Sequence, residues 1–149
     1  MKRSNKHIWV TLLFVMGWQT TSLAEAQRYI SIRNTDSLWA QGVCSLVFRL
    51  DNGGAGEFNQ LEVNIELNDK TGHVLEKGTL NVAPFGDSDA TRSIDAAAEF
   101  DCEAVEKASN IRIVGVSEAR SNSTKVALPL STFDPQYYKP LKILVSQGE

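Results

Sequence analysis

The amino-acid sequence predicts an all-β domain, an antiparallel β-sandwich. Short segments with apolar residues at alternate positions recur along the chain, most clearly at 44–50 and 61–68. This period of two is typical of half-buried strands. Clusters of Gly, Asn, Asp and Pro separate the segments, and the sequence has no strand–helix–strand rhythm and no internal repeat. We therefore expect seven or eight short antiparallel strands in two packed sheets.

Residues 1–26 have the features of a cleaved secretory signal peptide. Three basic residues among the first six precede an apolar run from Ile8 to Trp18, and Ala24-Glu25-Ala26 resembles a cleavage site. The run has about 11 residues, well below the roughly 20 of a membrane-spanning helix, so cleavage is favoured over a retained anchor. We expect export through the inner membrane to the periplasm or beyond, no membrane insertion, and one mature domain at 27–149.

Net charge limits the partners of the mature chain. The full chain has 15 Lys and Arg, 18 Asp and Glu, and a net charge of −3. Three bases and one acid leave with the signal, so 12 bases face 17 acids and the net charge becomes −5. Nucleic acid and anionic membranes attract clustered Lys and Arg, so neither is expected as a partner.

The first strand is predicted at 29–33, where Ile30 and Ile32 share a face, and the polar run 34–37 is predicted to end it. Trp39 is the one tryptophan after the signal. We expect it to cap the core, with a surface anchor for a partner as the alternative. Trp39 is therefore also a candidate partner-binding residue.

The strand predicted at 44–50 carries on one face Cys44, Leu46, Phe48 and Leu50. The run 51–56 that follows contains three glycines and an Asn-Gly step, which mark a turn or an exposed loop. We expect a hairpin-type connection or a binding loop. Calcium binding by Asp51 and Asn52 is disfavoured, because the run has too few carboxylates for a calcium loop. Since sandwiches bind through end loops, these two residues are candidate partner-binding residues.

A hairpin is predicted at 61–82. Apolar and polar residues alternate strictly over 61–68, the run 69–72 supplies turn residues, and 73–82 returns as the antiparallel partner. His73 stands beside the turn without a second histidine, so we expect an exposed surface residue.

Residues 93–102 are predicted to form another alternating strand, although the alanine-rich run from 96 to 108 also suits a helix. A helical turn is expected at 103–109 and a β-branched central strand at 111–116. A weaker strand is expected at 125–128 and a last one at 141–145.

Cys44 and Cys102 remain after signal cleavage, and an even pair in an exported protein is most simply a disulfide. Each cysteine shares parity with the apolar residues of its strand, so we expect the two to meet across the core of the sandwich. A redox pair or a metal site fits less well, since the chain has no C-x-x-C motif and the mature part has one histidine.

The segment 129–140 contains three of the four prolines and a concentration of aromatic residues. Phe133, Tyr137 and Tyr138 are candidate partner-binding residues, because aromatic side chains are enriched at interfaces. Packing over the end of the sandwich is an equal alternative. Prolines before a terminal strand also favour strand exchange between protomers.

Catalytic motifs are missing from the sequence. It has no G-x-S-x-G, no phosphate-binding glycine loop and too few histidines for a zinc triad. We expect no enzyme activity, no metal and no cofactor. A binding module is favoured, since sandwiches bind through end loops and exposed strand edges.

The strand pattern indicates a sandwich of the immunoglobulin or fibronectin type III kind. From its basic signal through Cys44 and Phe100-Asp101-Cys102 to Tyr137-Tyr138, the chain resembles the interleukin receptor mimic proteins of pathogenic enterobacteria. The resemblance implies a secreted fibronectin type III-like protein that forms a strand-exchanged homodimer, binds host interleukins and modulates host immunity as a virulence factor. It implies no contact residue.

Two other functions remain open. Export, size, two cysteines and β content also suit a fimbrial subunit or another exported surface-assembly protein, which would be an incomplete sandwich with an open groove. A periplasmic enzyme or enzyme inhibitor is the third possibility.

Overall fold

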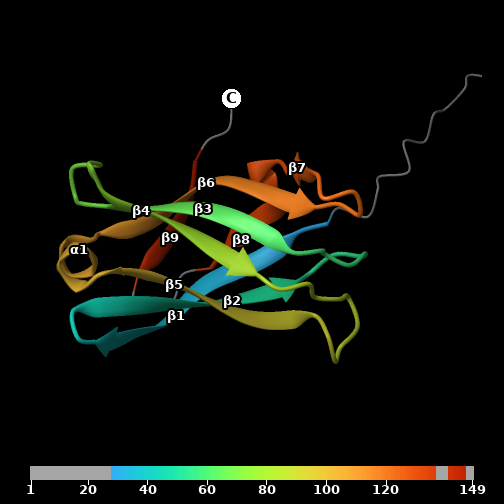
Figure 1. Cartoon of the computed structure of the whole chain (residues 1–149), viewed down its shortest axis with the longest axis horizontal. Coiled ribbons are helices and arrows are strands. Elements are labelled where there is room, and N and C mark those ends of the chain that lie inside the picture. The colour runs from blue at the N-terminus through green and yellow to red at the C-terminus, as the bar shows by residue number, and fades with distance from the viewer. Residues whose placement is uncertain (1–27, 137–140, 147–149) are drawn as a thin grey trace, which may run out of the picture.

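The computed structural model describes residues 28–136 and 141–146, and it confirms an all-β sandwich of two packed sheets (Figure 1). One sheet has the order β5-β2-β1-β8, and the other has the order β4-β3-β6-β7, with β9 also paired to β6. The elements are β1 (Ile30–Ala40), β2 (Val43–Asn52), β3 (Leu61–Asn68), β4 (Val74–Val82), β5 (Ser93–Asp101), α1 (Cys102–Lys107), β6 (Asn110–Ala119), β7 (Lys125–Ala127), η1 (Leu130–Thr132), β8 (Phe133–Pro135) and β9 (Lys142–Val145).

β2 and β3 form the centre of the core, one from each sheet. The inward side chains of β3 are at most 1 % exposed, and those of β2 join them in one hydrophobic cluster. Burying one such aliphatic or aromatic side chain stabilises a fold by about 1.5–3 kcal/mol. The alternating pattern in the sequence therefore reflects two facing sheets.

The predicted hairpin of β3 and β4 is confirmed, and one carboxylate builds its turn. Asp69 Oδ1 accepts hydrogen bonds from Thr71 N and His73 N at 2.9 and 3.0 Å, and from Thr71 Oγ1 at 2.8 Å. The Thr71 hydrogen bond lowers the pKa of Asp69 below its ordinary value. The side chain of His73 is 82 % exposed, as expected.

β1 is longer than predicted. The polar run 34–37 does not end the strand, because a bulge between Asn34 and Asp36 keeps β1 paired with β2 as far as Ala40. The Asn34 side chain is buried, and its Nδ2 donates to Val47 O at 2.8 Å and to Asp36 O at 3.1 Å. One amide side chain thus satisfies carbonyls that the bulge leaves unpaired.

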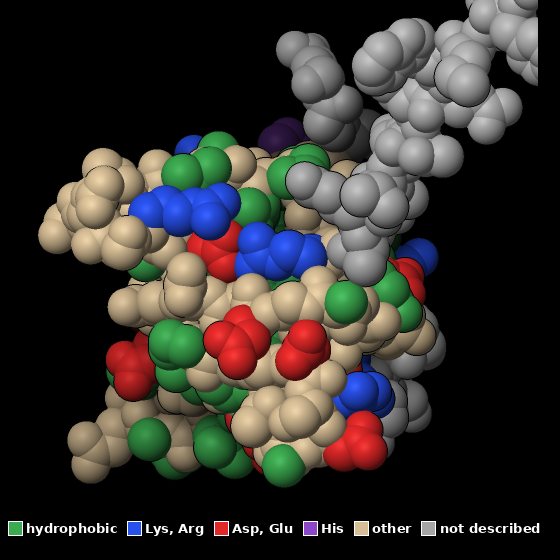
Figure 2. All heavy atoms as spheres, turned by 90° about the vertical axis from the view of Figure 1, so that its right-hand side faces the viewer, with side chains coloured by type: hydrophobic (Ala, Val, Ile, Leu, Met, Phe, Trp, Pro, Cys, Tyr) green, Lys and Arg blue, Asp and Glu red, His purple; other side chains and the backbone are tan. Residues whose placement is uncertain are grey.

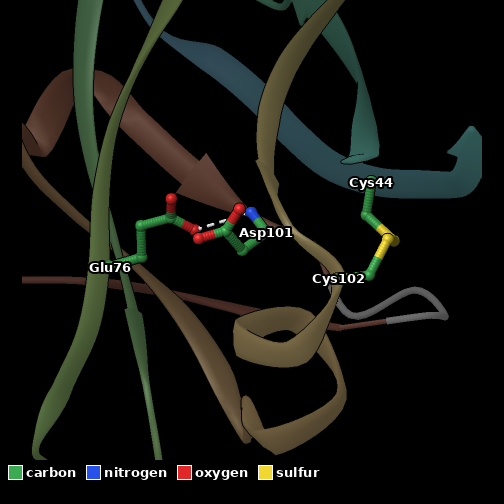
Figure 3. Close-up of a disulfide and its surroundings, with 4 residues drawn as sticks. All are labelled: Cys44, Glu76, Asp101 and Cys102. Carbon is green, nitrogen blue, oxygen red and sulfur yellow. Dashed lines mark hydrogen bonds between the residues drawn. A yellow bond between two sulfur atoms is a disulfide. The ribbon is translucent and has the colours of Figure 1, made fainter. Parts of the chain in front are cut away.

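The Cys44–Cys102 disulfide is confirmed, but the expectation that it crosses the core is wrong. β2 and β5 are neighbours in one sheet, and Cys44 lies opposite Phe100. Cys102 is the first residue of α1, so the bridge joins the start of β2 to the start of the helix, with a Cα–Cα distance of 4.9 Å (Figure 3). Parity shows which face a cysteine is on, but it does not show which strands are neighbours.

β5 follows the strand prediction and not the helical alternative. Ala98 and Phe100 are 4 % and 2 % exposed, because the alternating face packs into the core. The helix formers that follow do form α1, close to the expected turn. β6 lies between β3 and the β7–β9 side of its sheet, so its prediction as a central strand is confirmed.

The tail departs from a purely antiparallel arrangement. β8 pairs in parallel with β1, and β9 pairs in parallel with β6. The chain changes sheets between these two short strands, so it adds an edge strand to each sheet. Ile143 of β9 is 3 % exposed in the core. The incomplete sandwich of a fimbrial subunit would lack such a strand.

The two ends of the sandwich differ in chemistry. The β1–β2 turn, α1 and the β3–β4 turn gather at the left end in Figure 1, and the loops 53–60, 83–92 and 120–124 lie at the right end. Figure 2 looks onto that right end, where acidic and basic side chains are mixed with scattered apolar ones.

An ion pair fastens the segment just before β1 at this mixed end. Glu118, 1 % exposed, accepts hydrogen bonds from the Arg28 guanidinium and from Asn59 N at 3.0 Å, and Arg120 lies 3.6 Å away. Arg28 also lies 4.2 Å from the Phe58 ring centroid. Burial raises the pKa of Glu118, but the hydrogen bonds from Arg28 and Asn59 outweigh it and hold the pKa below its ordinary value.

Candidate interaction surface

Trp39 lies near the exposed end of β1, with 71 % of its surface exposed. The expectation that it caps the core is wrong. Trp39 stands opposite Cys44 in the hairpin, but β8 pairs with β1 only from Ile30 to Ile32. Within the part of the chain that the structure describes, no strand lies beyond β1 at this level to cover the indole. The alternative of a surface anchor stays open.

The outer face of the β5-β2-β1 sheet has an exposed surface beside the β1–β2 turn, close to Trp39 in sequence. Three cross-strand rows lie there: Leu38, Ser45 and Glu99; Ala40, Val43 and Asp101; Asp36, Val47 and Ala97. We call these nine residues the tip face. On β2 and β5 the side chains of the tip face alternate with buried ones and so point away from the core, and their cross-strand partners on β1 share that face.

The tip face combines an apolar centre with an acidic border. Leu38 and Val43 are 54 % and 41 % exposed. The carboxylates of Asp36, Glu99 and Asp101 are exposed at the sides. Exposed apolar patches rimmed by polar groups are typical of interaction sites.

Among the described residues, the carboxylates of the tip face form no salt bridge, whereas carboxylates further along the same sheet do. Further along β5, Asp95 lies 3.4 Å from Arg49, which is also 3.9 Å from Asp51. No salt bridge between described residues includes Glu99 or Asp101. The negative charge at this end of the sheet is therefore left to solvent or to a partner.

A disulfide and two hydrogen bonds from backbone amides fasten the strands of the tip face. Gln41 and Gly42 have positive φ values of 51° and 86°, as tight hairpin turns require. Cys102 N donates to Gly42 O at 3.1 Å beside the disulfide. On the other side of the strand, Glu76 of β4 accepts a hydrogen bond from Asp101 N at 3.0 Å (Figure 3). The end of β5 is thus fastened to β2 and to β4.

The glycine-rich run at 51–56 is a structured crossing between sheets and not a hairpin. Asn52 is 1 % exposed, and its Nδ2 donates to Gly56 O and Gly86 O at 2.8 and 2.9 Å. The expectation that Asn52 contacts a partner is not met, because its amide holds two loops together. Asp51 lies on the outer face of the sheet and accepts a hydrogen bond from Ser93.

The aromatic candidates of the tail divide in two. Phe133 is 5 % exposed in the hydrophobic cluster, so it supports the alternative of packing within the sandwich and is not available to a partner. Tyr137 and Tyr138 lie outside the described residues. Of the candidates that are described, Trp39 has the most exposed surface.

Metal ligands, membrane-spanning helices and hollows give no stronger candidate site among the described residues. Among the described residues, no three His, Cys, Asp or Glu side chains stand close enough to hold a metal ion. No described helix is both long and apolar enough to cross a bilayer. A hollow of about 420 Å³ at the mixed end is lined by Phe58, Phe85 and neighbouring loop residues. The rings of Phe58 and Phe85 stack at 5.2 Å there and help to close the core.

Comparison with known proteins gives the family. A family model described as interleukin receptor mimic protein A, or IrmA, matches residues 30–136. The chain belongs to the IrmA family. A solved structure described as the structural characterization of IrmA from Escherichia coli is 46 % identical, with a TM-score of 0.67, and the match covers 80 % of this chain and 100 % of that chain. None of the curated proteins matches.

The IrmA family match extends from the start of β1 to just beyond β8. It therefore includes the disulfide, the hairpin with Trp39 and the whole tip face. The family is named for receptor mimicry, which agrees with a function in protein binding. The resemblance noted from the sequence is confirmed at the level of family and fold.

Sequence reasoning missed the tip face. One signal was present: Leu38, Trp39 and Val43 flank a Gln-Gly turn, and apolar residues there occupy positions of both parities. A half-buried hairpin would place polar residues at one parity. The exposed carboxylates of β5 gave no signal, because only the register with β2 places them beside Val43.

Proposed function

We propose that this member of the IrmA family is an exported, non-enzymatic protein that binds host interleukins and modulates host immunity. The observation that carries the proposal is the family match over residues 30–136, supported by 46 % identity to a solved IrmA structure. The fold supports it because a disulfide and cross-strand hydrogen bonds fasten an exposed hairpin to the sandwich. Preorganised surfaces lose little entropy on binding.

Direct binding tests the proposal. The mature chain, residues 27–149, is immobilised and a panel of human interleukins is passed over it in a surface plasmon resonance experiment. At least one interleukin is expected to bind at micromolar concentration or below. Absence of binding across the panel at micromolar concentrations would contradict interleukin recognition.

Within this proposal Trp39 is a contact residue. Large, exposed and rigid aromatic side chains are frequent hot spots. Trp39→Ala is expected to weaken interleukin binding about tenfold or more, with an unchanged unfolding midpoint, since the indole is 71 % exposed. Val126→Ala, at a position 41 % exposed on β7, is the matched control.

Export is part of the same proposal. Removal of residues 1–26 by signal peptidase predicts a mature protein that starts at Gln27. Mass spectrometry of the intact protein from periplasm and medium checks this. A protein that retains Met1 in the cytoplasmic fraction would contradict export.

We further propose that the protein forms a strand-exchanged homodimer. Support comes from the tail, where β9 is a four-residue edge strand that pairs in parallel with β6 after a proline-rich segment. Light scattering on the mature protein is expected to give twice the chain mass. A monomeric mature protein would contradict the exchange.

A further inference from the structure

We propose that the tip face is the docking surface for a protein whose contact patch has an apolar centre flanked by Lys or Arg side chains. Where that partner is an interleukin, the inference rests on the proposed function and deepens it. The chemistry of the surface is argued from the residues of the tip face alone.

The apolar centre differs from the polar outward face of the central strand in the other sheet. Outward positions of the neighbouring sheet are polar, as Glu62, Asn64 and Glu66 of β3 show. On the tip face, outward positions carry Leu38 and Val43, both more than two-fifths exposed. Leaving branched aliphatic side chains on an open sheet face costs hydration free energy that a covering partner would recover.

The acidic border selects the charge of the partner. Glu99 and Asp101 stand on β5 and Asp36 stands on β1, on either side of the apolar residues of β2. Neighbouring strands lie about 4.8 Å apart and each residue advances about 3.3 Å along a strand, so Asp36 and Asp101, the two carboxylates furthest apart, are separated by roughly 16 Å, within the width of one protein–protein contact patch. Basic groups placed around an apolar side chain would meet all of them.

The same charges argue against other occupants. An anionic lipid surface would be repelled by three carboxylates on the face that it must contact. A second copy docked tip to tip would bring like charges together in the buried interface. A basic protein surface is the occupant that satisfies both the apolar centre and the border.

The first arm of the test does not depend on any interleukin. Backbone amide spectra of ¹⁵N-labelled mature protein are recorded with two synthetic 14-residue amphipathic peptides, one of Leu and Lys and one of Leu and Glu. The Lys peptide is expected to shift the signals of Leu38, Val43 and Ala97, and the Glu peptide to leave them in place. Shifts that map elsewhere, or equal shifts with both peptides, would overturn the inference.

The second arm uses variants of the mature protein. Leu38→Asp and the double variant Glu99→Lys with Asp101→Lys are each expected to weaken Lys-peptide binding at least tenfold. Val126→Asp, an equally exposed valine outside the tip face, is expected to stay within twofold of wild type. Circular dichroism and unfolding midpoints confirm that each variant is folded. Binding within twofold of wild type for both tip-face variants would overturn the inference.

The two proposals fail in different ways. If no interleukin binds but the Lys peptide maps to the tip face, interleukin recognition is wrong and the docking surface stands. A second outcome is that an interleukin binds the wild-type protein while the tip-face variants bind both that interleukin and the Lys peptide as tightly as wild type. In that case the proposed function stands and the docking surface is wrong. If Leu38→Asp halves the mass by light scattering while leaving peptide binding unchanged, the face joins two copies and the inference is overturned.

Discussion

At the residue scale, Gly78 shows how closely the two sheets approach at the β4 and β5 edges. A Cβ atom on Gly78 would lie 2.6 Å from Cε1 of Phe100, which is 2 % exposed and has no room to move. A position that reads in the sequence as a weak strand residue is therefore a packing requirement.

Gly78→Ala is expected to destabilise the protein by about 1–3 kcal/mol, because overpacking forces the Phe100 ring or the backbone to shift. Urea denaturation measures the loss. Gly115→Ala is the matched control in β6, where the new Cβ would lie 3.3 Å from the amide nitrogen of the exposed Asn64 side chain, which can swing away. Equal stability of the two variants would contradict this account.

Glu118 is a buried carboxylate whose ionisation contributes to the stability of the fold. Arg28 and Asn59 hold its pKa below the ordinary value of 4.5, so its charged form stabilises the folded state above that pH. The contribution is lost as the pH falls through the lowered pKa of the folded state. Glu118→Gln is expected to cost about 1–3 kcal/mol at pH 7, since hydrogen bonds to a charged group are lost.

Denaturation of wild type and Glu118→Gln at several pH values checks this linkage. The stability difference between the two proteins is expected to be constant from pH 7 to about 5 and to shrink towards pH 3. Glu103→Gln, whose carboxylate is 79 % exposed beside Lys107, is the control and is expected to show a negligible difference. A Glu118 difference that does not change with pH would show that packing, and not charge, is responsible.

At the element scale, the disulfide links β2 to α1 across 58 positions of sequence. In the chain-entropy model, a closed loop of this length stabilises the fold by about 4 kcal/mol through restriction of the unfolded chain. The bridge also fastens the end of β5 beside the tip face.

Cys44→Ala with Cys102→Ala is expected to lower stability by about 2–4 kcal/mol and to broaden the amide signals around Gly42 and Asp101. Urea denaturation and NMR spectra of the double variant measure the two effects. Unchanged stability would show that the hydrogen bonds from Cys102 N and Asp101 N fasten this end without the bridge.

Elements were predictable where burial follows the local period. The strict alternation of apolar and polar residues predicted where β3 begins and ends, because one face of the strand packs against the core along its whole length. β1 was not predictable past Arg33, because the bulge at 34–36 shifts the parity and the buried Asn34 looks like a loop residue. A polar residue that satisfies backbone carbonyls cannot be told from a turn residue by composition.

At the scale of the whole molecule, the tail adds an edge strand to each sheet. Phe133 of β8 and Ile143 of β9 are 5 % and 3 % exposed, so the tail also completes the core. Unpaired strand edges are prone to intermolecular pairing.

Deletion of residues 129–149 is expected to cost at least about 3 kcal/mol from the two lost core side chains, and to cause aggregation through the uncovered edges of β1 and β6. Thermal unfolding and light scattering measure these effects. Deletion of residues 147–149 alone is the control and is expected to leave the midpoint unchanged. A tail deletion that unfolds like wild type would contradict a structural role for β8 and β9.

The sequence by itself determined the class of fold, the strands with a regular period of two, the β3–β4 hairpin and the existence of a disulfide. These features depend on local patterns or on a count of cysteines. Tertiary structure decided which strands are neighbours, and with that the course of the disulfide, the exposure of Trp39 and the burial of Asn52 and Phe133. Register between β1, β2 and β5 also decided that apolar and acidic side chains distant in sequence share the tip face, because cross-strand pairing is a long-range property that no local pattern contains.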